Sequence, residues 1–249
     1  MAQYGNSLQR TTPIVLNLII INVLVNLAQR LVPGVTEWGS LHYFQSTLFK
    51  PHQIITNMFL HDPEGYSHIL FNMFALWMFG SILERFWGSK KFLVFYLICG
   101  IAAALLIEIT VPFSVNQAAR TALQDAADAT PGFAHGISIE QLILQNKDVF
   151  QQTLSSLKET YSVLGASGAI MGVMAAFAYL FPNTKLYIMF IPIPIAAKYV
   201  IPGLVLIDLF GGLYQIKGDN IGHFAHLGGA LVGVIMVLIW NKTNKQTFY

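Results

Sequence analysis

The sequence predicts an all-α polytopic protein that crosses a membrane six times. Of its 249 residues, 55% are hydrophobic and 10% are charged, whereas an average soluble domain has about 25% charged residues. The apolar residues fall into separate runs, and each is close to the roughly 20 residues that a helix needs to cross the hydrocarbon core. The six predicted spans are residues 13–32, 68–86, 91–112, 163–181, 197–213 and 221–240.

The first of these runs follows a short polar stretch and resembles a signal peptide in length. Because further apolar runs follow it, we interpret it as an uncleaved first span. The chain then divides into an N-terminal segment, 1–12, a membrane domain, 13–241, and a tail, 242–249.

Three connecting segments need their own interpretation. Residues 33–67 are aromatic and apolar, and we expect them to lie in the membrane interface. Residues 113–160 are polar, so we expect a helical insertion outside the membrane. Prolines interrupt residues 186–196, which we expect to be re-entrant or interfacial.

The positions of lysine and arginine predict the orientation. Short cytoplasmic loops are enriched in these residues. With the N-terminus inside, the inner segments hold eight of them, and the much longer outer segments hold six. We therefore expect a multi-pass protein of the cell membrane, either plasma or inner membrane, with both termini cytoplasmic and the lipid bilayer around it.

The sequence also argues against a nucleic-acid partner, an intrachain disulfide and a metal site. The net charge is +2, and the only basic cluster is Lys90–Lys91, so we expect no nucleic-acid partner. The single cysteine, Cys99, excludes an intrachain disulfide and is expected to be a small buried apolar residue. The sequence has no His-Glu-x-x-His pattern, and we expect no metal site.

Four polar side chains share one predicted depth in the membrane. His68 and Asn72 open the second span, Ser167 lies near the start of the fourth, and His226 near the start of the sixth. In the predicted orientation these three spans run inward, so all four residues lie one to two turns from the outer surface. Polar residues inside a membrane are costly, and they therefore indicate function.

The four residues have complementary chemistry. Serine is a weak nucleophile that needs an adjacent base, and His226 is the candidate. Ser167 would begin a helix, where free backbone N–H groups and the helix dipole favour a negative charge. Asn72 and His68 would supply further donors to an oxyanion. This set predicts acyl-transfer chemistry.

Each residue also has a structural explanation. Ser167 would serve as a helix cap or a packing contact, Asn72 as an interhelical hydrogen-bond partner, and His226 as a buried structural histidine. Packing alone does not predict the shared depth together with the complementary chemistry.

Glycines flank the candidate residues. Gly165 and Gly168, on either side of the serine, are expected to allow close packing and to leave room for a substrate backbone. Gly229 and Gly233 form a small-x₃-small face on the sixth span, which would let it approach the fourth span closely.

The motifs together resemble the rhomboid family of intramembrane serine proteases, over roughly residues 45–240. They are "HILFN" with His68 and Asn72, "GASG" with Ser167, and "AHLGGALVG" with His226. A fourth is "GSILERFWG", a Gly-x₃-Glu-x₃-Gly pattern around Glu84. Glu84 lies about 24 Å along the helix from His68, at the cytoplasmic end, so we expect a structural role for it.

The resemblance implies a six-helix rhomboid-like bundle with a cavity open to the outside. It implies a Ser167–His226 dyad without an acidic third residue, and an oxyanion held by the Ser167 backbone N–H beside His68 and Asn72. It also implies the absence of metal and cofactor. Transmembrane proteins with a single span would be the substrates, cut near the outer end of a helix that must first unwind.

The sequence departs from the family pattern at several points. His52–Gln53 stands where rhomboids often have Trp-Arg, and residues 113–160 exceed the compact family pattern. Met171 stands where an aromatic ring often stacks on the catalytic histidine. Asp208 in the fifth span is expected to be water-facing or interfacial.

Two other functions compete with protease activity. One is a proteolytically inert rhomboid-like protein that binds membrane clients, which the intact Ser167 and His226 argue against. The other is a small transporter or channel, but the sequence shows none of the internal repeats that transporters commonly have.

Overall fold

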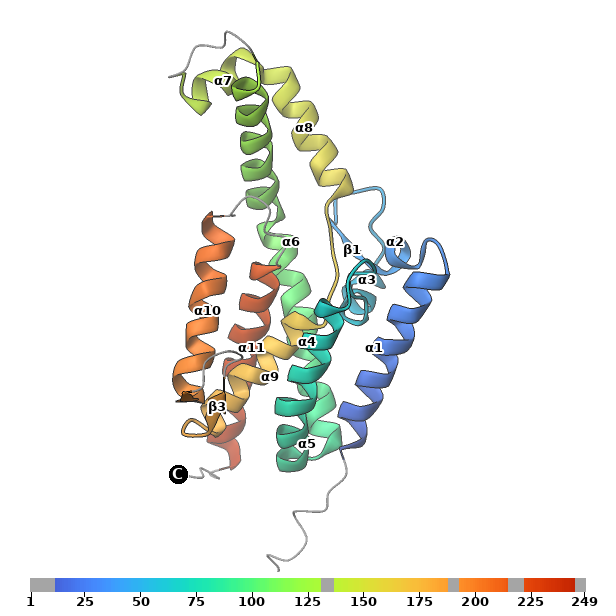
Figure 1. The fold of residues 1–249 in the computed structure, drawn as a ribbon, viewed down its shortest axis with the longest axis vertical. Helices are drawn as coiled ribbons and strands as arrows, with labels where there is room; N and C mark the ends of the chain where they lie inside the picture. The colour runs from blue at the N-terminus through green and yellow to red at the C-terminus, as the bar shows by residue number, and fades with distance from the viewer. Residues whose placement is uncertain (1–11, 131–136, 188–192, 215–221, 245–249) are drawn as a thin grey trace, which may run out of the picture.

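The computed structural model describes residues 12–130, 137–187, 193–214 and 222–244, with side chains up to residue 241, and it is mostly helical (Figure 1). Within these residues, five helical segments are long and apolar enough to cross a membrane, and a sixth apolar helix is shorter. The mostly helical fold class predicted from the sequence is confirmed. The long segments are α1 (Pro13–Leu31), α4 to α5 (Ser67–Trp87), α6 (Ser89–Asp128), α10 (Ala197–Tyr214) and α11 (His223–Asn244).

The second span is one continuous helical segment with a change of pitch. It consists of α4 (Ser67–Ala75), a π-helical turn η2 (Leu76–Gly80) and α5 (Ser81–Trp87). Such turns often occur at functional sites, but this one lies about two to three turns below His68, toward the other end of the span.

The fourth span is shorter than the sequence predicts. Helix α9 runs from Ser167 to Leu180, whereas Ser162–Val163 form a strand, β2, that pairs antiparallel with β1 (Leu41–His42). A helix of 14 residues is about 21 Å long, which is less than the ~30 Å of a hydrocarbon core. Figure 1 shows that α9 begins midway along the bundle, at the level where α4 begins.

Helix α6, which contains the third span, continues through Pro112 for 40 residues into the segment expected to be a helical insertion. Its upper half, with α7 (Ile139–Gln145) and α8 (Lys147–Thr160), projects beyond the other helices (Figure 1). Val111 and Val115 are buried against Leu154 and Leu157 of α8. This burial offsets the roughly 3 kcal/mol that an internal proline costs a helix.

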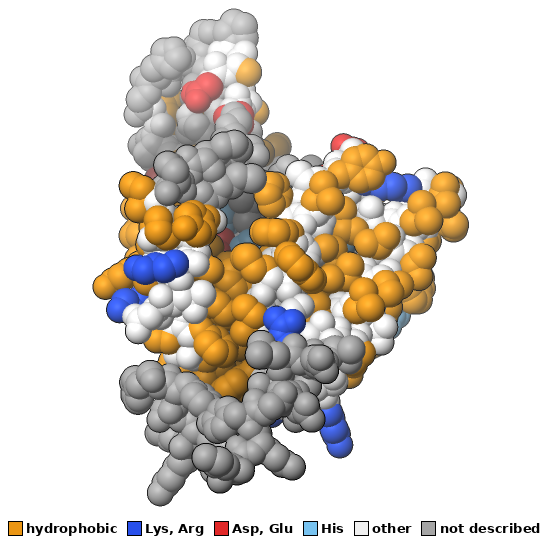
Figure 2. Space-filling model, turned by 60° about the horizontal axis from the view of Figure 1, so that its bottom comes forward, with side chains coloured by type: hydrophobic (Ala, Val, Ile, Leu, Met, Phe, Trp, Pro, Cys, Tyr) orange, Lys and Arg blue, Asp and Glu red, His pale blue; other side chains and the backbone are white. Residues whose placement is uncertain are grey.

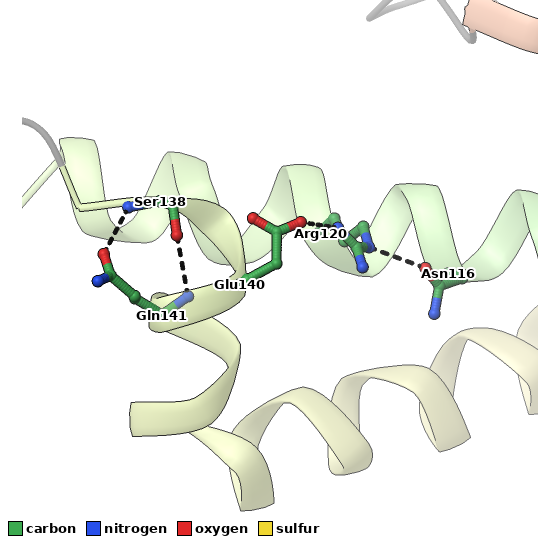
Figure 3. A network of polar contacts seen from close by, with 5 residues as sticks. All are labelled: Asn116, Arg120, Ser138, Glu140 and Gln141. Carbon is green, nitrogen blue, oxygen red and sulfur yellow. Dashed lines mark hydrogen bonds and ion pairs between the residues drawn. The ribbon is translucent and has the colours of Figure 1, made fainter.

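Polar contacts fix the tip of this projection (Figure 3). Ser138 and Gln141 form a reciprocal capping box at the start of α7. Arg120 of α6 donates to Asn116 (3.0 Å) on its own helix and to Glu140 (3.2 Å) on α7. The described part of the predicted insertion is therefore helical and docked on α6, and its position outside the membrane stays a prediction.

Short elements fill the segment between the first two spans. They are α2 (Val35–Gly39), β1, α3 (Gln53–Thr56) and a 3₁₀ turn, η1 (Asn57–Phe59). The pair that replaces Trp-Arg is built into this segment. The His52 ring stacks on Trp38 with centroids 4.2 Å apart, and the buried Gln53 accepts hydrogen bonds from the backbone N–H groups of His42 and Lys50.

Residues 186–196 include part of a hairpin. β3 (Lys185–Tyr187) pairs antiparallel with β4 (Pro194–Ala196), immediately before α10. Residues 188–192, with Pro192, lie outside the described residues, so the expected re-entrant path stays a prediction.

Large apolar side chains cover the outside of the bundle. Figure 2 shows hydrophobic side chains over much of one face, with few lysines or arginines among them. On α1, Leu16, Leu24 and Leu27 are each at least half exposed. Soluble monomers rarely expose such continuous apolar surface, and a lipid-facing surface explains it.

Glu84 anchors the start of α1. Its carboxylate accepts hydrogen bonds from the backbone N–H groups of Ile14 (3.0 Å) and Val15 (2.8 Å) and from the Ser89 hydroxyl (2.6 Å), and it is 1% exposed. It thereby satisfies free N–H groups at the positive end of the α1 dipole. These contacts join three helices at the end of the bundle remote from Ser167.

Candidate active site

Ser167 is the first residue of α9, and the chain reaches it through a glycine with positive φ. Gly165 has φ +137°, and a Cβ there would lie 3.2 Å from two atoms of the His68 ring. The Gly165 N–H also donates to the Asn57 carbonyl (2.9 Å). Both the backbone conformation and the close approach of His68 therefore favour glycine at this position.

The four residues that share a predicted depth line one cavity of about 800 Å³. His68 and Asn72 come from the first two turns of α4, Ser167 from the start of α9 and His226 from the first turn of α11. Figure 1 shows that these three helices run in the same direction. Met171 also lines the cavity.

Backbone-to-backbone packing brings α9 and α11 together. A Cβ on Gly229 would lie 1.8 Å from the Gly168 carbonyl oxygen, and one on Gly233 would lie 2.7 Å from the Gly172 carbonyl oxygen. Gly168 has no space for a side chain either, because a Cβ there would lie 2.5 Å from the Ala103 Cβ of α6. The missing side chain at Gly168 thus serves helix packing.

The expectation that Asp208 is water-facing or interfacial is wrong. Asp208 is 7% exposed, and its Oδ1 lies 2.9 Å from His226 Nδ1 and 2.8 Å from His223 Nδ1. Helix α10 ascends beside α11, so its outer half lies level with the first turn of α11 (Figure 1). A carboxylate inside an apolar span is a sequence signal of such a partner.

The hydrogen bonds of His68 and Asn72 indicate which of their N–H groups remain available to a substrate. His68 Nδ1 accepts from the Asp62 backbone N–H (3.3 Å), so the proton of a neutral His68 ring is on Nε2. Asn72 Nδ2 donates to the His68 carbonyl (3.0 Å) and retains a second N–H. Among the described residues, no hydrogen bond joins the Ser167 hydroxyl to His226; bonds of this kind often form only when substrate binds.

No group of three or more His, Cys, Asp or Glu side chains within the described residues is arranged to hold a metal ion. His223, His226 and Asp208 meet through one carboxylate oxygen instead, which is an arrangement for hydrogen bonding.

His61 lies behind His68 and is fully buried. The two ring centroids are 5.1 Å apart, and neither His61 ring nitrogen has a hydrogen-bond partner within the described residues. Burial, and secondarily the nearby His68, lower the pKa of His61 from 6.5 to about 4. His61 is therefore neutral at pH 7.

This low pKa predicts a loss of stability in mild acid. Between pH 6.5 and 4 the unfolded chain binds a proton at His61 that the folded chain does not bind, so unfolding becomes easier as the pH falls. The full effect is about 3 kcal/mol near pH 4. The unfolding midpoint in detergent, followed by tryptophan fluorescence, should fall less steeply with pH in His61→Phe than in the wild type. If the unfolding midpoint fell equally steeply with pH in the two proteins, the low pKa of His61 would be contradicted.

Comparison with known proteins shows to which family the chain belongs. The family model described as the Rhomboid domain matches residues 49–123 and 131–242. The chain belongs to the rhomboid family. It is accordingly a multi-pass membrane protein, and this membership confirms the resemblance drawn from the four motifs.

Several curated rhomboid proteins are similar at low identity. Rhomboid protein 1, mitochondrial, of Saccharomyces cerevisiae is 26% identical over 182 residues, which is 73% of this chain and 40% of that protein. Presenilin-associated rhomboid-like protein A, mitochondrial, of Danio rerio is 28% identical over 181 residues, covering 70% and 36%. Rhomboid protease GluP of Bacillus subtilis is 25% identical over 182 residues, covering 73% and 24%. The chain thus matches less than half the length of each of these relatives.

Proposed function

We propose that this rhomboid is an intramembrane serine endopeptidase that cleaves the transmembrane segments of single-span membrane proteins near the outer face. The observation that carries the proposal is the cavity where Ser167, His226, His68 and Asn72 meet at the starts of three parallel helices. The similarity to a protein named a rhomboid protease supports the same reaction class. The positions of the lysines and arginines support both termini being cytoplasmic, in a plasma or inner membrane.

Ser167 and His226 would carry the covalent step as a dyad. The Ser167 Oγ attacks the scissile carbonyl carbon, and His226 accepts the hydroxyl proton and passes it to the leaving amine. Water then enters, gives a proton to His226 and hydrolyses the acyl-enzyme. Because imidazole titrates near neutral pH, it can act as base and then as acid within one cycle.

The negative charge that develops on the carbonyl oxygen would be held by three donors. The Ser167 backbone N–H lies at the start of α9, where it has no partner within the helix and the dipole favours an anion. His68 offers Nε2–H, since its Nδ1 accepts from Asp62, and Asn72 offers its second amide proton. Preorganised donors of this kind are usually a large part of the stabilisation of such a transition state.

The short α9 supports cleavage within the membrane but near one surface. Since α9 is about 21 Å long, Ser167 would lie below the outer boundary of the hydrocarbon core when the other end of α9 reaches the inner one. A substrate helix must expose its backbone to reach Ser167, which favours small or helix-breaking residues at the cleavage site.

A fluorophosphonate probe tests the proposal directly. We expect it to label the folded protein in detergent at one site, and peptide mass spectrometry should locate the adduct on Ser167. Heat-denatured protein is the control and should not react, because an isolated serine hydroxyl is a poor nucleophile. Labelling no greater than that control would favour the inert client-binding function.

A further inference from the structure

A buried carboxylate contacts His226 in the structure, at a residue that the sequence had led us to expect in water or at the interface rather than in a triad. Asp208 Oδ1 lies 2.9 Å from His226 Nδ1, and the two side chains are 9% and 17% exposed. The same oxygen lies 2.8 Å from His223 Nδ1. One carboxylate on α10 thus binds two histidines in the first turn of α11.

Two glycines of α10 allow this contact with α11. A Cβ on Gly211, three residues after Asp208, would lie 2.4 Å from His223 Nε2, and one on Gly212 would lie 3.2 Å from the Phe224 ring. The absence of side chains at these two positions lets the first turn of α11 lie against α10. Asp208 is consequently within hydrogen-bond distance of both rings.

Met171, which stands where the family often has an aromatic ring, lines the same cavity as His226. It packs with Ala175 and Ala230 in a small apolar cluster, and Ala230 lies one turn beyond His226 along α11. A flexible thioether also orients a ring less strictly than a hydrogen bond does.

Asp208 also supplies the charge that His226 needs when it acts as a base. Protonated His226 would be a cation near the start of α11, where the helix dipole disfavours positive charge. The titratable groups that line the cavity besides His226 are His68 of α4 and Asp62 and Glu64 in the loop before α4; α9 contributes none, and His223 contacts Asp208 outside this lining. Among these groups, Asp208 is the carboxylate that contacts the ring of His226.

We propose that Asp208 is a positioning residue for the proposed protease reaction. It accepts the Nδ1 proton of His226, which leaves the lone pair of Nε2 available to the Ser167 hydroxyl, and it stabilises the imidazolium formed during attack. The inference rests on the proposed function, and it adds Asp208 as a positioning residue to the Ser167–His226 dyad.

The test compares Asp208→Asn with the wild type in proteoliposomes that contain a single-span substrate. We expect kcat to fall by about 10²- to 10⁴-fold with little change in KM, because asparagine can stabilise the wrong tautomer of His226. We also expect the acid limb of the pH–rate profile to move to lower pH, since the imidazolium loses its counter-charge. Asp208→Glu should recover part of the activity.

Two controls separate positioning from a structural role. Asp148→Asn removes an exposed carboxylate on α8 and should leave the rate and the pH profile unchanged. His223→Asn removes the second partner of Asp208 and should keep activity within about tenfold of the wild type, with an unshifted acid limb. If Asp208 only anchors α10 to α11, both Asp208→Asn and His223→Asn should lower the unfolding midpoint and leave the acid limb in place.

The outcomes also distinguish this inference from the proposed function. Wild-type cleavage that needs Ser167 but is unaffected in rate and pH profile by Asp208→Asn would overturn the positioning role alone. Cleavage that survives the loss of Ser167 would overturn the serine protease itself.

Discussion

Replacing Ser167 with alanine should abolish cleavage of a single-span substrate and leave the fold intact. The loss should be about 10⁴-fold or more, because without its nucleophile the cavity retains only substrate binding and oxyanion stabilisation. The Ser167 hydroxyl makes no hydrogen bond within the described residues, so its removal should change the free energy of unfolding by less than about 1 kcal/mol. Cleavage in proteoliposomes and the unfolding midpoint in detergent measure the two effects.

Ser81→Ala is a matched control for this experiment. Ser81 is 5% exposed, its hydroxyl, like that of Ser167, has no hydrogen-bond partner within the described residues, and it begins α5 near the other end of the bundle. The proposal predicts activity within about twofold of the wild type for this variant. Substantial cleavage by Ser167→Ala would exclude a serine nucleophile at this position.

Gly229→Ala should be among the most destabilising single-methyl additions in the chain. The added Cβ would lie 1.8 Å from the Gly168 carbonyl oxygen, and a backbone atom cannot rotate away as a flexible side chain can. Helices α9 and α11 must separate, which should cost about 3 kcal/mol or more. The unfolding midpoint should therefore fall by roughly 6–12 °C. Proteolysis should fall as well, because separation moves His226 away from Ser167.

Gly203→Ala makes the same chemical change where there is space. Gly203 lies in α10, and a Cβ there would have no neighbour within 4 Å. This variant should be neutral or slightly stabilised, since alanine favours a helix over glycine by up to about 1 kcal/mol. A midpoint of Gly229→Ala equal to that of Gly203→Ala would show that the close contact between α9 and α11 does not exist in the membrane protein.

The sequence predicted much of the candidate site because the relevant residues are local to the ends of spans. An apolar run fixes where a helix crosses the membrane, and the direction of each crossing then fixes which end lies outside. His68, Ser167 and His226 could therefore be assigned one depth without any contact information. The small-x₃-small spacing of Gly229 and Gly233 likewise marks a helix face that can approach another backbone.

The boundaries of two spans depended on neighbours far away in sequence. Hydropathy placed residues 163–166 inside the fourth span, but Val163 pairs with Leu41 as a strand, and α9 begins only at Ser167. The third span was predicted to end at residue 112, where a polar segment follows, but packing of α8 on α6 supports a helix that continues to Asp128. Helix and strand propensities depend on nearby residues, so they do not take either of these long-range contacts into account.

By itself, the sequence determined a polytopic helical protein of the rhomboid class, with its candidate nucleophile and base at one depth, because hydrophobic length and polar position along a helix are properties of the chain. Only the tertiary structure decided that Asp208 contacts His226. The two residues lie on helices whose relative rotation is set by packing at Gly211 and Gly212. Hydropathy gives the depth of a residue but not the direction in which its side chain points, and this direction distinguishes a water-facing carboxylate from one that holds a catalytic ring.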